Sequence, residues 1–275
     1  CEVKENDSLL TSIVSSPDYF VQDKETAFEK SSVGFVTYKD FTIIANVEDN
    51  SLKGHITMDG KEFASVKLPK LFDDFDQRSF TIAGSTGGSI IMHLTTESAP
   101  NLEYGALLKS NNNGTSFVTI ERAVNRNNRG FIDFEYVGDL EGVFITNVVT
   151  NPGKENKKLK TKISFNDGAI FRYLVPPEKN FKGEKYSCSS TDLEKCSLNL
   201  HSYTDRSDFR DSLSSGAGVG LLIGIGNVGE SLLPAEECST FLSTDGGISW
   251  KEISSSPYQY EFGDRGNIIV LVSND

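Results

Sequence analysis

The stretch "STDGGISW", residues 243–250, decides the fold because it recurs along the chain. "SNNNGTSF" (110–117) and "SFNDGAIF" (164–171) share its pattern Ser-x-Asp/Asn-x-Gly-x-x-aromatic, and "TMDGKEF" (57–63) is a copy that is one residue shorter. Successive copies begin 53, 54 and 79 residues apart. Self-similarity at a period of about 53 residues, with one insertion, indicates a chain built from tandem structural units.

The recurring motif has a structural interpretation. An Asp or Asn side chain accepts backbone N–H groups across a tight turn, a Gly adopts a conformation closed to other residues, and an aromatic residue is buried between sheets. We interpret each copy as an Asp-box turn between two antiparallel strands, with no acid–base role. A calcium loop is the alternative for "NNNGTS" (111–116), but the bidentate Glu of such a loop is absent there. The predicted Asp-box residues are Thr57, Asp59, Phe63, Ser110, Asn112, Gly114, Phe117, Ser164, Asn166, Gly168, Phe171, Ser243, Asp245, Gly247 and Trp250.

The periodicity of the rest of the chain is that of strands. Runs such as "GFVTY", "FTIIANV", "SIIMHL" and "GVFITNVV" are rich in β-branched and aromatic residues and are bounded by Gly, Asn and Asp. Each repeat divides into four strands, with the Asp-box turn between the third and the fourth. The expected units are 33–67, 79–121, 131–175 and 197–253, with half a unit at 257–275 and the end of a preceding unit plus a linker at 1–32.

Tandem four-stranded units of about 40 to 55 residues are typical of β-propeller blades, which pack around a central channel. The sequence therefore predicts an all-β fold: a β-propeller with about four and a half blades. An incomplete last blade cannot close a ring by pairing edge to edge. We expect this chain to be a sector of a larger propeller that is completed by other residues of the same protein.

The stretch "GLLIGIGNVGESLL" (220–233) raises a competing interpretation, because it contains the G-x-G-x-x-G spacing of dinucleotide-binding loops. The repeat, however, assigns "GLLIGIG" to the second strand of the fourth unit and the residues from Asn227 onward to a connection. Only Asn227–Leu233 remain before a proline, and a βαβ crossover needs about 10 to 12 residues. These glycines are predicted to belong to a strand and its loop, and no cofactor is expected.

Charge and hydropathy exclude two partner classes. The formal net charge is −12, so a nucleic-acid partner is not expected. The lysine run "GKENKKLKTK" (153–162) is most simply a solvated hairpin loop. Apolar runs such as "NIIVLV" (267–272) are far shorter than the roughly 18 residues of a membrane span. Membrane attachment is therefore expected only through segments outside this chain.

The four cysteines are Cys1, Cys188, Cys196 and Cys238. The middle two lie eight residues apart in a polar loop, which suits a local disulfide. Zinc is the alternative, but there is no C-x-x-C pair and the nearby His201 stands alone, so no metal is predicted. Cys1 and Cys238 are left to pair with each other or with cysteines outside this chain.

A disulfide implies an oxidising compartment. The glycosylation sequons at Asn6 and Asn113 are compatible with secretion.

The segment 196–253, from "CSLNLHSYTDR" to "STDGGISWKEI", followed by "YQYEFGDRGNIIVLV" (258–272), resembles the sortilin-type vacuolar sorting receptors, most closely their fungal members. The resemblance runs over about residues 30–275 and includes "GTSFVTIERAVNRNNRGFIDFEYVGDLEGVFITNVVTNP" (114–152). It implies a lumenal ten-bladed propeller with Asp-box turns, followed by a cysteine-rich module, a membrane span and a short cytosolic tail. The chain would be the C-terminal part of that propeller.

The resemblance also implies a function. Receptors of this family bind soluble vacuolar hydrolase precursors in the late Golgi, release them at the endosome and recycle, without acting as enzymes. Relatives bind peptide ligands inside the propeller tunnel, and the loop that contains Cys188 and Cys196 is disulfide-bonded in them. Ligand-contact residues are not identified here. Arg122, Arg126 and Arg129 are candidates for an acidic ligand, although a solvated connection between blades is the simpler interpretation.

Two other functions use similar propellers. A sialidase-type glycosidase carries the same turn, but it needs an arginine cluster for the substrate carboxylate and an acid-activated nucleophile, and the arginines here do not recur at strand starts. A carbohydrate-binding or scaffold propeller predicts exposed aromatic residues at the blade rims, whereas Trp250 is already used by its Asp-box turn.

Overall fold

The chain forms two compact units, residues 1–94 with 108–119 and residues 95–107 with 120–275. Nearly all of its regular structure is β, as the sequence predicts. No helix in the described ranges is long and apolar enough to cross a bilayer. The computed structural model describes residues 2–4, 11–21, 26–48, 51–70, 80–188, 190–206, 213 and 218–273.

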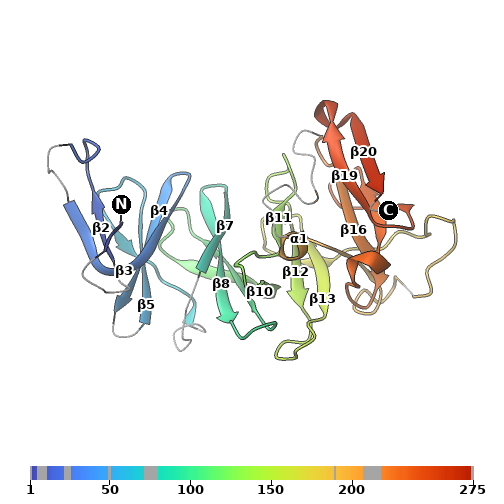
Figure 1. The fold of residues 1–275 in the computed structure, drawn as a ribbon, viewed down its shortest axis with the longest axis horizontal. Coiled ribbons are helices and arrows are strands. Elements are labelled where there is room, and N and C mark those ends of the chain that lie inside the picture. Colours follow the sequence, from blue (N-terminus) through green and yellow to red (C-terminus); the bar gives the residue numbers. More distant parts are fainter. Residues whose placement is uncertain are drawn as a thin grey trace. The chain divides into compact units, whose positions relative to one another are not determined.

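The first unit contains an antiparallel sheet whose strands lie in chain order (Figure 1). Phe41, Ile44 and Ile56 are buried in its core. Residues 1–32, interpreted from the sequence as the end of a preceding unit, contribute two strands and the first half of a third to this same sheet. The strands are β1 (Glu2–Lys4), β2 (Thr11–Ser15), β3 (Thr26–Tyr38), β4 (Phe41–Glu48), β5 (Ser51–Thr57) and β6 (Ala64–Ser65).

Four further strands follow in the order in which they occur in the chain, and the last three have residues in both units. These strands are β7 (Phe80–Thr86), β8 (Ser89–Glu97), β9 (Tyr104–Ser110) and β10 (Phe117–Asn125). Residues Ser89–Thr95 of β8 are all buried, which explains why "SIIMHL" is apolar without a strict alternation.

The second unit contains the next two sets of four strands. In the first set, β12 pairs with β11 and β13, and β14 pairs with β13, all antiparallel. The end of β10 also pairs with β12, at Val124 and Val148, and so joins this set to the preceding strands. The second set forms an antiparallel sheet in chain order. The strands are β11 (Phe134–Tyr136), β12 (Phe144–Val149), β13 (Leu159–Ser164) and β14 (Arg172–Tyr173), then β15 (Ser197–Leu200), β16 (Leu222–Gly229), β17 (Ser239–Ser243) and β18 (Lys251–Ser254).

A single apolar core joins these two sheets of the second unit. It includes Ile145 and Ile163 from one sheet and Leu198, Phe241 and Trp250 from the other. The unit also contains the short helices α1 (Tyr203–Arg206), η2 (Ala235–Glu237) and η3 (Asp264–Gly266). It ends in the hairpin of β19 (Tyr258–Gly263) and β20 (Ile268–Ser273). Tandem four-stranded antiparallel sheets are the architecture of β-propeller blades.

The glycine-rich stretch 220–233 forms a strand at the centre of its sheet. β16 pairs antiparallel with β15 on one side and β17 on the other, so Gly224–Gly229 do not form a phosphate-binding loop. A Cβ on Gly226 would lie 1.9 Å from the Asn199 carbonyl oxygen in β15. This close approach of two backbones is the physical reason for a glycine within the strand. The strand continues to Gly229, beyond the Asn227 boundary expected from the sequence.

Candidate functional site

The fourth Asp-box turn is closed by its own side chains. Ser243 Oγ donates to Asp245 Oδ1 (2.9 Å) and accepts from the Gly247 N–H (2.9 Å). The Ser249 N–H donates to the same Asp245 oxygen (2.9 Å), and the buried Trp250 donates from Nε1 to the Gly247 carbonyl (3.2 Å). Burial raises the pKa of Asp245, but the hydrogen bonds from Ser249 and Ser243 outweigh it and hold that pKa below its ordinary value.

The third and first turns follow the same plan. Ser164 Oγ donates to Asn166 Oδ1 (3.1 Å) and accepts from the Gly168 N–H (3.0 Å). In the shorter copy Thr57 Oγ1 donates to Asp59 Oδ1 (3.1 Å) and accepts from the Gly60 N–H (2.9 Å). The aromatic residues Phe171 and Phe63 of these two turns are half-buried, less than Trp250.

The second turn departs from the prediction. Asn111 Oδ1 accepts the N–H groups of Thr115 (2.9 Å) and Ser116 (3.2 Å), which is the role predicted for Asn112, and Asn112 itself is exposed. Residues 111–113 are all asparagine. The spacing of the motif predicted Asn112, whereas Asn111 forms the hydrogen bonds. Asn113 is exposed, and its Oδ1 accepts from Thr115 Oγ1 (2.6 Å), so the sequon lies on the surface of the turn.

The backbone conformation of this turn favours glycine. Gly114 has a φ of +71°, and a Cβ there would lie 2.1 Å from Ile56 Cδ1. The buried Phe117 follows it as the aromatic residue of the motif.

Cys188 and Cys196 form a disulfide that closes a loop of the second unit. Among the described residues Cys238 is a free, buried cysteine, while Cys1 and the sequon at Asn6 lie outside these residues. No group of three or more His, Cys, Asp or Glu side chains in the described ranges is placed to hold a metal ion.

The three candidate arginines do not share one environment. Arg122 and Arg129 are exposed, whereas Arg126 is half-buried and donates to the Asn127 carbonyl (3.4 Å).

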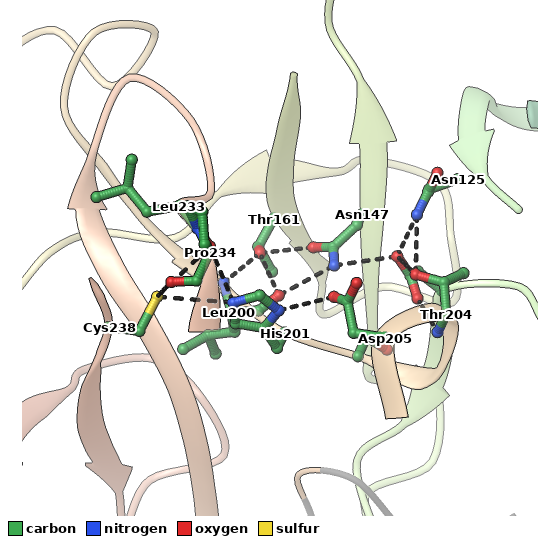
Figure 2. Close-up of polar contacts among 12 residues, drawn as sticks. Asn125, Asn147, Thr161, Leu200, His201, Thr204, Asp205, Leu233, Pro234 and Cys238 are labelled. Carbon is green, nitrogen blue, oxygen red and sulfur yellow. Dashed lines mark hydrogen bonds and ion pairs between the residues drawn. The ribbon is translucent and has the colours of Figure 1, made fainter. Parts of the chain in front are cut away.

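A polar cluster of the second unit lies between strands β12 and β13 and the end of β15, at residues that match no motif (Figure 2). Asn147 on β12 donates to the Leu200 carbonyl (3.0 Å), and Thr161 on β13 donates to Asn147 Oδ1 (2.6 Å). Thr161 Oγ1 also accepts the Leu200 N–H (2.7 Å). Two side chains of one sheet thus bind both backbone groups of one residue in the next, and we call this cluster the polar junction.

At one edge of the polar junction, two buried carboxyl groups accept hydrogen bonds from residues that follow β15 in the chain. Asp133 Oδ1 accepts the Thr204 N–H (2.8 Å), and its Oδ2 accepts from Thr204 Oγ1 (2.9 Å) and Asn125 Nδ2 (2.8 Å). Glu135 accepts from Ser202 Oγ (2.8 Å) and from the Leu213 N–H (3.1 Å). Burial, together with the charge of Asp205, raises the pKa of Asp133, against the hydrogen bonds from Asn125 and Thr204.

His201 forms the other edge of the polar junction. Its Nδ1 lies 2.7 Å from Asp205 Oδ2, and its Nε2 lies 3.0 Å from the Leu233 carbonyl and 3.6 Å from Cys238 Sγ (Figure 2). Burial alone would lower its pKa, but the contacts with Asp205 and Cys238 raise it to about 10. An imidazolium at neutral pH cannot act as a general base for the thiol, which is only 2% exposed. The three side chains therefore form a structural link.

The lysine run 153–162 is only in part the solvated loop predicted from the sequence, because residues 153–156 and Lys158 are exposed whereas three of its other lysines bind protein oxygens. Lys157 Nζ donates to Asn125 Oδ1 (2.7 Å) and to the Glu103 and Arg126 carbonyls (3.1 and 3.0 Å). Lys160 donates to the Leu193 and Glu194 carbonyls, and Lys162 pairs with Glu121 (2.8 Å). Neighbouring segments enclose the side chains of Lys157, just before β13, and of Lys160 and Lys162 within it. Their ammonium groups therefore bind protein oxygens in place of water.

This chain is similar to known proteins over nearly its whole length. The Sortilin-Vps10 family (Sortilin, neurotensin receptor 3) matches residues 1–275. Vacuolar protein sorting/targeting protein PEP1 of Saccharomyces cerevisiae is 50% identical over 278 residues, which cover 99% of this chain and 18% of that protein. Vacuolar protein sorting/targeting protein 10 of Kluyveromyces lactis is 45% identical over 284 residues, covering 100% and 18%. This chain thus spans less than a fifth of the length of these two relatives.

Two further similarities were found. An uncharacterized membrane glycoprotein of Saccharomyces cerevisiae, YNR065C, is 50% identical over 278 residues, covering 99% of this chain and 25% of that protein. The β-propeller domain of the Trilobed protease from Pyrococcus furiosus aligns with a TM-score of 0.40 at 8% identity, covering 93% of this chain and 67% of that one.

Proposed function

This chain belongs to the sortilin–Vps10 family, and from that premise we propose that it is part of the lumenal, ligand-binding region of a transmembrane sorting receptor. The receptor would carry soluble vacuolar hydrolase precursors from the late Golgi to the endosome and vacuole. The observation that carries the proposal is the 50% identity to Vacuolar protein sorting/targeting protein PEP1 over 99% of this chain. The family consists of receptors, so no enzymatic step is assigned.

We propose further that 33–67, 79–121, 131–175 and 197–253 are successive blades of a ten-bladed propeller, and that 257–275 begins another. The Asp-box turns support this division, as do the antiparallel strands β7–β10, β11–β14 and β15–β18, four in each of the last three units, while the first sheet has six strands. The rest of the receptor would supply the remaining blades and the membrane span. The disulfide between Cys188 and Cys196 and the exposed sequon at Asn113 suit the lumen of the secretory pathway, where Asn113 would carry a glycan.

Such a region would bind its cargo and break no covalent bond in it. The Asp-box turns and the polar junction use their polar groups to hold sheets together, and a rigid scaffold of this kind presents a preformed surface to a protein or peptide. Pre-organisation lowers the entropic cost of binding.

A chimeric receptor tests the proposal. In the PEP1 relative, the matching segment is replaced by this chain, and the chimera is expressed in yeast that lacks PEP1. We expect the hydrolase precursors to be delivered to the vacuole instead of being secreted, measured as the secreted fraction of a vacuolar hydrolase. A chimera that reaches the late Golgi at normal abundance but leaves secretion as high as in the null strain would contradict the proposal.

A further inference from the structure

One corner of the second unit brings together an amine, an amide and a carboxyl group away from solvent. Lys157 Nζ lies 2.7 Å from Asn125 Oδ1, and Asp133 Oδ2 lies 2.8 Å from Asn125 Nδ2. Asn125 is 3% exposed, Asp133 is 0% exposed and the Lys157 side chain is 18% exposed. The amide carbon lies at most one C=O bond, about 1.2 Å, farther from the amine than the amide oxygen does.

We propose that Lys157 and Asn125 react to form an intramolecular isopeptide bond, with Asp133 as the proton-transfer group. Neutral Lys157 Nζ attacks Asn125 Cγ, and the Nζ–Cγ bond forms. Protonated Asp133 donates to the amide nitrogen, the Cγ–Nδ2 bond breaks and ammonia leaves. The new amide nitrogen then returns a proton to Asp133. One amine and one primary amide give one secondary amide and one ammonia, so the step balances without an oxidant or a further reactant.

The surroundings hold the three groups in a reactive arrangement. The Glu103 and Arg126 carbonyls accept the other hydrogen bonds of Lys157 Nζ and fix it against the amide, which reduces the entropic cost of attack. Thr204 Oγ1 accepts from Asn125 Nδ2 (3.0 Å) and donates to Asp133 Oδ2 (2.9 Å), and so provides a relay for the proton.

Burial favours the uncharged forms of both Lys157 and Asp133, which are the forms that the reaction needs. Burial lowers the pKa of Lys157, although Glu103 and Asp133 attract its charge, and burial raises the pKa of Asp133. Moving one proton from the ammonium to the carboxylate therefore creates the nucleophile and the acid together.

The bond would brace two neighbouring parts of the second unit. Asn125 is the last residue of β10, and Lys157 lies in the connection between β12 and β13. The cross-link would join residues 32 apart in sequence and, unlike the disulfide, would survive reduction. This inference does not depend on the receptor function.

Peptide mapping of the full chain purified from a eukaryotic secretory host tests the proposal. After reduction and tryptic digestion, we expect a branched peptide that joins the segments around Asn125 and Lys157, lighter than their sum by one ammonia. Trypsin should fail to cut after Lys157. Recovery of the two segments only as separate, unmodified peptides from folded wild-type protein would overturn the proposal.

Variants separate the chemistry from folding. Lys157→Arg keeps the charge and the hydrogen-bond donors but removes the amine nucleophile, and it should abolish the branched peptide. Asp133→Asn removes the acid and should greatly reduce the yield. Lys162→Arg, on the same lysine run but paired with Glu121, is the matched control and should retain the cross-link. A branched peptide that persists in Lys157→Arg would show that another lysine reacts and would refute the assignment.

Discussion

At the scale of single residues, the motif predicted glycines better than it predicted hydrogen-bond partners. A glycine in a tight turn is dictated by local backbone geometry, so Gly114, Gly168 and Gly247, each with a positive φ, could be found from spacing alone. The asparagine that closes the second turn could not, because residues 111–113 are all asparagine and only their orientation distinguishes them.

The two asparagines make a matched pair for a test of the second turn. Asn111→Ala removes the acceptor of two backbone N–H groups and should lower the free energy of unfolding by about 0.5–1.5 kcal/mol. Asn112→Ala changes an exposed side chain and should leave stability almost unchanged. Thermal unfolding of both variants measures the difference. Greater destabilisation by Asn112→Ala would restore the original prediction.

Gly226 allows a second test at this scale. In Gly226→Ala the new Cβ would meet the Asn199 carbonyl oxygen, which belongs to the backbone and cannot rotate away, so we expect a loss of about 1–3 kcal/mol. Gly229→Ala is the control, because its nearest neighbour is a side-chain atom at 3.4 Å. Equal unfolding midpoints for the two variants would argue against the close strand approach.

At the scale of elements, the strands were predictable and the polar junction was not. Strands such as β8 and β16 follow from runs of residues that are adjacent in sequence. The contact of Asn147 and Thr161 with Leu200 depends on how two sheets pack, and the residues involved lie up to 53 apart. Lys157, Lys160 and Lys162 show the same limit, because their sequence is that of a solvated loop and neighbouring segments, distant in sequence, enclose these three side chains while residues 153–156 stay exposed.

The link between α1 and the residues before β17 predicts a pH dependence. The pKa of His201 is raised to about 10 in the folded protein from an ordinary value of 6.5, so folding favours the protonated form. This contribution to stability is complete below pH of about 6.5 and is lost as the pH rises through about 10. Denaturant unfolding should therefore show wild type losing stability between neutral pH and pH 10.

Asp205→Asn provides the comparison. It removes the charge that holds the imidazolium, so the variant should be less stable at neutral pH and should lose less on going to pH 10. If the free energy of unfolding changed with pH in the same way in wild type and Asp205→Asn, the ion pair between His201 and Asp205 would not contribute to the pH dependence of stability.

At the scale of the whole molecule, most of the fold was predicted from the sequence repeat. A period of about 53 residues, with a turn at a fixed place in each unit, was enough to indicate tandem four-stranded sheets. The resemblance to sorting receptors agrees with the family match over residues 1–275. The cargo-binding surface could not be predicted, because it depends on which loops face a ligand and this is not encoded in a local motif.

The most direct test of the account is a cryo-electron microscopy structure of the complete lumenal region of the receptor with a vacuolar hydrolase precursor bound. We predict that 33–67, 79–121, 131–175 and 197–253 are consecutive blades around one channel and that the precursor contacts this ring. Blades belonging to separate domains, or a precursor bound wholly elsewhere, would contradict the account.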